Sequence, residues 1–170
     1  TVHPAIQAAG AVCSWARVMG ILGHAFTFSM QKGCGRCDWE GNIDWWLFFS
    51  RLENLGMSFD HFQAVQNNPH ITPLSEEALK QLKEDTWTAV KASIDRGVPA
   101  VAWAPMTPEQ KKSGIGGYDW SLLAGYDEST KAYLVRSPVR DNKEYEVPFD
   151  GFGYNDPVQW YYVLVPATER

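Results

Sequence analysis

Cys13 stands where a catalytic nucleophile would be expected in this sequence. It follows a turn of small residues at 8–11 and opens a segment, 13–22, that we predict to be a helix. Backbone N–H groups and the positive end of the dipole at the first turn of a helix favour a thiolate. Gln7, six residues upstream, is placed to offer an amide donor to an oxyanion. The pair indicates acyl-transfer chemistry, and a cysteine that only fills space in the core is the simpler alternative.

A thiol nucleophile needs a base, and the sequence offers four histidines. His24 comes eleven residues after Cys13, which is about 16 Å along a helix and too far unless the helix breaks. His3 lies on the entry segment and could fold back toward Cys13. His61 falls on a predicted strand and His70 in a turn. For each of them we favour an ordinary surface or satisfied histidine over a general base.

Cys34 and Cys37 form an isolated C-x-x-C pair. Such a pair can be structural, can supply half of a zinc site, or can form a redox disulfide. A zinc site needs two more ligands, and the nearest candidates, His24 and Asp38, lack a standard spacing. The pair also lacks the strand-to-helix setting of a thioredoxin-type site. We therefore favour the structural interpretation and expect neither a bound metal nor a cofactor.

The composition indicates one globular domain over 1–170. Aromatic residues make up 14% of the chain, which suggests a large core, a stacking pocket, or both. The net charge of −5 argues against nucleic acid or an anionic membrane as the main partner. No apolar run approaches the length of a membrane span, and the start lacks the features of a signal peptide. Because three cysteines make no disulfide framework, a cytoplasmic location is expected.

Hydrophobic patterns and turn residues predict helices in the first part of the chain and strands in the second. The helices are expected at 13–22, 42–55 and 75–96, and the longest is capped by Ser75 and ended by Gly97. The strands are expected at 57–65, 98–104, 120–126, 131–136, 144–149 and 158–165, with a further short strand or extended loop at 24–30. Those at 120–126 and 131–136 are expected to form a hairpin. Residues 1–6, with Pro4, are expected to be an extended entry, and 105–117 a polar loop whose glycines suit a mobile flap. The charged residues of 76–96 are expected to form a solvated helix face. The order of these elements indicates an α+β fold, in which N-terminal helices, including a buried one that carries Cys13, pack on a C-terminal antiparallel sheet.

The chain resembles a papain-like cysteine peptidase in the order of these elements. The resemblance rests on Gln7 with Cys13, on the helix before Gly-Val-Pro-Ala-Val-Ala-Trp at 97–103, and on the Gly-Tyr-Asp turn at 125–127. It is closest to the compact bacterial branch of bacteriocin-leader peptidases and butirosin-type acyltransferases. The resemblance covers most of the chain and implies a papain-like fold.

The residues that this family uses beside its cysteine are replaced here. The resemblance places a histidine six or seven residues before Gly125, where this sequence has Asp119 and Tyr118. It places an orienting Asp or Asn on the next strand, where this sequence has Ser137 before a proline. The family needs an imidazole to take the thiol proton and a polar group to orient that imidazole. The resemblance therefore implies a scaffold that has lost its usual catalytic residues.

Two functions remain open from the sequence. The first is a catalytically degenerate domain that binds a peptide or a small amphipathic ligand in the former cleft, lined by Tyr118, Asp119, Trp120 and Ser137 near Cys13. The second is an active thiol hydrolase or acyltransferase in which Cys13 uses an unusual base. A structural or assembly module without a ligand is the third and simplest alternative.

Overall fold

The computed structural model describes residues 2–22, 45–66, 70–138, 144–153 and 159–167, and every structural statement below concerns this part of the chain. Its helices are α1 (Val2–Ala8), α2 (Trp15–Ile21), α3 (Trp45–Ser50), the 3-10 helix η3 (Arg51–Leu55), α4 (Glu76–Asp95) and α5 (Pro108–Ser113). Its strands are β1 (Phe59–Gln66), β2 (Ala100–Trp103), β3 (Trp120–Asp127), β4 (Ala132–Arg136), β5 (Glu144–Pro148) and β6 (Gln159–Pro166).

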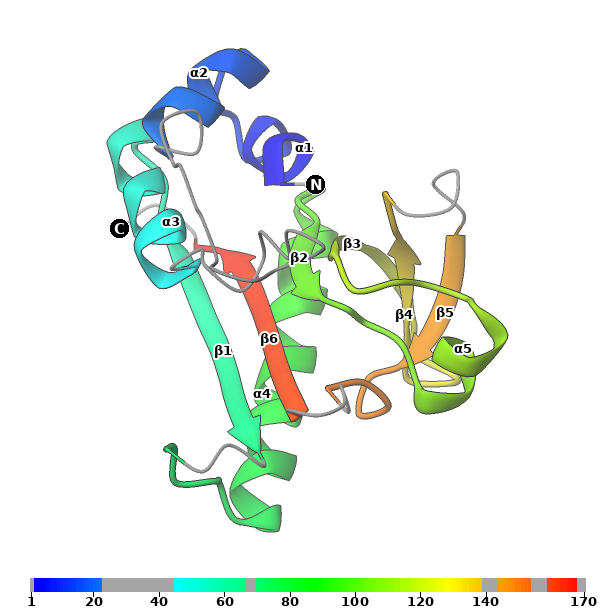
Figure 1. Cartoon of the computed structure of the whole chain (residues 1–170). Helices are drawn as coiled ribbons and strands as arrows, with labels where there is room; N and C mark the ends of the chain where they lie inside the picture. Colours follow the sequence, from blue (N-terminus) through cyan, green and yellow to red (C-terminus); the bar gives the residue numbers. More distant parts are fainter. Residues whose placement is uncertain (1, 23–44, 67–69, 139–143, 154–158, 168–170) are drawn as a thin grey trace, which may run out of the picture.

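The strands form one antiparallel sheet in the order β1-β6-β2-β3-β4-β5 (Figure 1). The expected strands of the second half are present, and β3 and β4 form the expected hairpin. β1, from the middle of the chain, joins the same sheet by pairing along its full length with β6. The prediction of an α+β fold with an antiparallel sheet is confirmed at this level.

Helices cover both faces of the sheet, and the alternation of side chains along β2 shows how. Val101 and Trp103 pack in a core cluster with residues of α1, α2, α3 and η3. Ala100 and Ala102 pack in a second cluster with Trp87 and other residues of α4. Figure 1 accordingly shows α4 crossing behind β6, away from the N-terminal helices. Because both faces are covered, all four residues of β2 are buried.

The long helix α4 forms as predicted from its end signals. The Ser75 hydroxyl accepts a hydrogen bond from Ala78 N at 3.2 Å, which satisfies one of the free N–H groups of the first turn. Gly97, with φ of 80°, ends the helix in the left-handed conformation that glycine adopts without strain. Trp87 and Val90, on the predicted apolar face, are buried against the sheet.

The prediction that Cys13 opens a buried helix is wrong in two respects. The helix α2 begins at Trp15 because Ser14 is its N-cap, with a hydroxyl that accepts a hydrogen bond from Arg17 N at 3.2 Å. Cys13 therefore precedes the helix. Within α2 only Val18 is buried, and Trp15 is 53% exposed. A two-turn helix contacts the core along one side, so an apolar composition did not by itself imply burial on every side.

Two short helices lie where the sequence predicted extended or irregular chain. Pro4 suggested an extended entry, but it falls in the first turn of α1, where proline is tolerated because the N–H there has no partner within the helix. The helix α5 begins inside the predicted loop 105–117. Its Thr107 and Gln110 form a reciprocal capping box, and this Thr-x-x-Gln pattern was readable in the sequence.

The remaining expectations fall partly outside the described residues. The expected helix 42–55 is present from residue 45 onward but changes from α-helix to 3-10 helix at Arg51. The segment 24–30 and the Cys34–Cys37 pair lie outside the described residues, so their interpretations stay predictions.

Candidate functional site

Cys13 lies in the turn between α1 and α2. Its side chain is half-buried and packs against the core cluster that also contains Ile6 and Trp120. The helix α1 packs against β2 and β3, which places this turn on the same face of the sheet as Trp120. Gln7 lies on α1 and is exposed.

His3 is the histidine that the structure brings to Cys13. Its Nε2 lies 3.0 Å from the carbonyl oxygen of Cys13, and its ring meets the Trp15 ring edge-on with centroids 5.8 Å apart. The imidazole therefore contacts the peptide group of Cys13. The contact connects α1 to the start of α2 across the turn that carries the cysteine.

The start of β3 places an acidic residue at the position where the resemblance expected a histidine. The Asp119 Oδ1 accepts a hydrogen bond from Trp120 N at 2.7 Å. Burial raises the pKa of this carboxyl, and the hydrogen bond from Trp120 acts in the opposite direction. Tyr118, the residue before it, is 40% exposed, and the Lys111 ammonium lies 4.8 Å from the centre of its ring.

The two other predicted ligand-binding residues are buried. Trp120 packs among aromatic rings, with Phe49 at 4.9 Å and Tyr162 at 5.2 Å between ring centroids. Ser137 follows β4 and is 1% exposed. Neither side chain is therefore exposed for contact with a ligand. The convergence of Asp119 and Cys13 on one cleft stays a prediction.

The glycine-rich loop before β3, which the sequence predicted to be a flap, packs against Tyr145 of β5. Gly116 has φ of 75°, and a Cβ at this position would lie 2.8 Å from the Tyr145 hydroxyl. That hydroxyl donates a hydrogen bond to the Pro105 carbonyl oxygen at 2.9 Å. The loop is therefore held close to β5 at Gly116.

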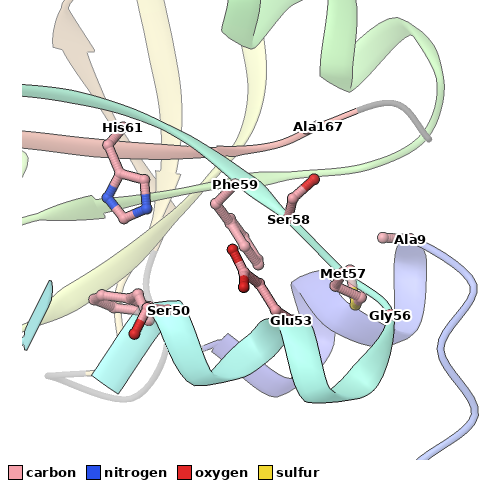
Figure 2. Close-up of a pocket in the computed structure, with 10 residues that line it drawn as sticks. Ala9, Ser50, Glu53, Gly56, Met57, Ser58, Phe59, His61 and Ala167 are labelled. Carbon is pink, nitrogen blue, oxygen red and sulfur yellow. The ribbon is translucent and has the colours of Figure 1, made fainter. Parts of the chain in front are cut away.

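A cavity of about 710 Å³ lies between β1 and the segment formed by α3 and η3 (Figure 2). Its described lining residues combine apolar and polar side chains with small ones. They are Ala9, Phe49, Ser50, Glu53, Gly56, Met57, Ser58, Phe59, His61 and Ala167. None of the six residues predicted from the sequence is among them. Phe49 contacts Trp120 and also lines the cavity, so the cavity adjoins the aromatic core on the side away from α4.

Two titratable side chains reach into this cavity from opposite walls. Figure 2 shows His61 extending from β1 toward the helix and Glu53 rising from η3 toward β1. His61 Nδ1 and the Tyr162 hydroxyl are 2.9 Å apart and share a hydrogen bond. Burial lowers the pKa of His61, and the neighbouring Asp60 carboxylate partly offsets this. Burial therefore favours the neutral form of the imidazole.

The sequence analysis missed this cavity, although part of the signal was present. Phe59 and His61 are two residues apart on a predicted strand and so share one face. Phe49 and Glu53 are four apart on a predicted helix and so share another. What the sequence did not contain was the packing of these two faces against each other.

In comparisons with known proteins, the sequence matches no family model and no curated protein, and the fold matches no solved structure. Within the described ranges, none of the helices has the length and apolar character needed to cross a membrane. In the same part of the chain, no three His, Cys, Asp or Glu residues are grouped as metal ligands would be.

Proposed function

We propose that this chain is a papain-like cysteine-peptidase scaffold that binds a peptide or a small amphipathic ligand without catalysing its cleavage. The order of helices and antiparallel strands is compatible with such a scaffold. The observation that carries the proposal is the start of β3. If the resemblance holds, Asp119 stands where the family has its general base, and its carboxylate accepts a hydrogen bond from Trp120 N.

A carboxylate at this position cannot perform the role of an imidazole. An imidazole ordinarily titrates near neutral pH and can both take and return a proton there, whereas a carboxyl group ordinarily titrates well below it. Its negative charge also opposes the formation of a neighbouring thiolate. Ser137, in the orienting position, is buried and uncharged. The binding function keeps the cleft and dispenses with the proton transfers.

The reactivity of Cys13 tests this proposal. Iodoacetamide labelling of the peptide that contains Cys13 would be followed by mass spectrometry from pH 6 to pH 10, with a cysteine-containing standard peptide in the same tube. The proposal expects Cys13 to require at least as high a pH as the standard. It also expects a mixture of tryptic peptides to slow the labelling by occupying the cleft. Labelling at markedly lower pH than the standard, or no protection by peptides, would contradict it.

The position of His3 favours one second candidate, an active thiol hydrolase or acyltransferase. The imidazole already lies against the peptide group of Cys13, at 3.0 Å from its carbonyl oxygen. A change in the Cys13 side-chain torsion or in the ring orientation would be needed to bring it to the sulfur. In that case Cys13 would label at lower pH than the standard, and His3→Ala would move its labelling back to the pH of the standard.

A further inference from the structure

The cavity between β1 and η3 has the size and the wall composition of a small-molecule site. Its volume of about 710 Å³ falls within the range of ligand pockets, roughly 300 to 1,000 Å³. Phe49, Met57 and Phe59 supply apolar surface on its walls. Such a cavity suits a ligand with an apolar body and a few polar groups.

The charge of the walls determines which polar group the cavity accepts. Among the described lining residues, Glu53 is the only Asp, Glu, Lys or Arg, and burial favours the neutral form of His61. The nearest basic residue in sequence, Arg51, donates from Nη1 to the Leu22 carbonyl oxygen at 2.9 Å. The Glu53 carboxylate forms no ion pair with a described residue, and Figure 2 shows its side chain rising toward β1.

The aromatic residues of the walls suit the apolar part of a ligand. Phe49 and Phe59 line the cavity and offer apolar ring surface. His61 is fixed by its hydrogen bond with the Tyr162 hydroxyl and adds a neutral polar group on the wall opposite Glu53. An anionic ligand would meet a like charge and no cation on the described walls.

We propose that this cavity binds a small amphipathic organic cation, with its ammonium group beside Glu53 and its apolar body against Phe49 and Phe59. This site is separate from the Cys13 region, since none of Gln7, Cys13, Tyr118, Asp119, Trp120 or Ser137 is among its described lining residues. Its occupation does not depend on whether that region is a former active site.

Three eight-carbon probes of equal length test the proposal, because they differ mainly in charge. Octylammonium, octanol and octanoate would be titrated into the protein by calorimetry at pH 7.5 and 0.15 M salt, where long-range attraction to the acidic chain is screened. Octylammonium should bind saturably, octanol more weakly, and octanoate at least about tenfold more weakly than octylammonium. Octanoate binding as tight as octylammonium, or no saturable octylammonium binding below about 10 mM, would overturn the proposal.

Glu53→Gln, with Glu109→Gln as its matched control, tests the assigned charge. Both variants remove one negative charge, but Glu109 lies on α5, beyond β5 from the cavity (Figure 1). Glu53→Gln should weaken octylammonium about three- to fivefold, which is the range of an exposed ion pair, and leave octanol unchanged. Glu109→Gln should leave both unchanged. Equal effects of the two variants would mean that the net charge of the chain causes the preference for cations. That result would refute the assigned site.

Ring resonances of the histidines locate the bound probe without any substitution. Octylammonium at saturation should shift the imidazole signals of His61, which lines the cavity, and should leave those of the exposed His70 in place. A shift at His70 with none at His61 would place the probe elsewhere on the surface and overturn the assignment.

Discussion

The Nε2 atom of His3 and the carbonyl oxygen of Cys13 are 3.0 Å apart, so the first helix is connected to the residue that precedes the second. The histidine thus supports the backbone of the cysteine turn. The ring of Trp15 packs edge-on against the same imidazole, with the ring centroids 5.8 Å apart.

Replacing His3 should loosen this turn. His3→Ala removes one hydrogen bond and the contact with Trp15, and we expect a loss of about 1 kcal/mol in the free energy of unfolding. His3→Gln, whose amide can still donate to the Cys13 carbonyl, should recover part of this loss. Urea denaturation of the two variants at pH 7.5 provides the measurement. Equal losses in the two would mean that the ring packing, and not the hydrogen bond, supports the turn.

Placing an imidazole at position 119 should restore part of the expected chemistry. Asp119→His removes a carboxylate and adds a group that stabilises a thiolate when protonated, so the labelling midpoint of Cys13 should fall by about one pH unit or more. Asp119→Asn, which removes the charge without adding an imidazole, should produce a smaller change. Identical midpoints in folded native, Asn and His proteins would show that positions 13 and 119 do not share a cleft. Ser137→Asp is a poor addition, because a carboxylate at this buried position would be costly.

His61 should make the protein less stable in mild acid. Burial lowers its pKa below the ordinary 6.5, so the unfolded chain binds the proton more readily than the folded protein does. The free energy of unfolding should therefore decrease as the pH falls below about 6.5, until both states are protonated. Asp60 beside it favours the imidazolium and limits this decrease.

A comparison with His61→Gln isolates the contribution of His61 to the pH dependence of the free energy of unfolding. The native protein should lose more stability than the variant between pH 7.5 and pH 5.5, measured by urea denaturation. His70→Gln, at an exposed position, serves as the control and should follow the native protein. A native protein no more acid-sensitive than His61→Gln would contradict the expected direction.

Lys83 fixes the turn after β5 to the helix α4. Its side chain is buried, and Nζ donates to the carbonyl oxygens of Asp150 at 2.6 Å and Phe152 at 3.3 Å. Lys83→Met keeps most of the apolar stem but removes the donor, so the Asp150 carbonyl oxygen and the buried Phe152 carbonyl oxygen lose a partner. We expect the free energy of unfolding to fall by about 2 to 4 kcal/mol.

An exposed lysine of the same helix provides the control for this loss. Lys80→Met should change stability by less than about 0.5 kcal/mol, as surface substitutions usually do. Thermal and urea denaturation of both variants measure the difference. A Lys83→Met protein as stable as Lys80→Met would show that the ammonium contributes little beyond the packing of its stem.

Local signals in the sequence were sufficient for the longest elements. Ser75 and Gly97 mark the ends of α4 because capping and the left-handed stop depend on neighbouring residues only. The hairpin of β3 and β4 was predictable for the same reason, since its strands flank a short polar turn. These features require no knowledge of distant segments.

The tertiary structure alone decided the exposure of α2, the burial of Lys83 and the position of β1. An apolar segment such as 15–21 is buried only where other elements cover it, and here one side of a two-turn helix is covered. Lys83 looked like part of a solvated helix face, but the turn at 149–153 lies over it and supplies its partners. The cavity beside His61 exists because β1 pairs with β6. This pairing holds the face of β1 that carries Phe59 and His61 opposite η3. Long-range pairings of this kind depend on contacts between segments about 100 residues apart, and local hydrophobic patterns do not encode which segments meet.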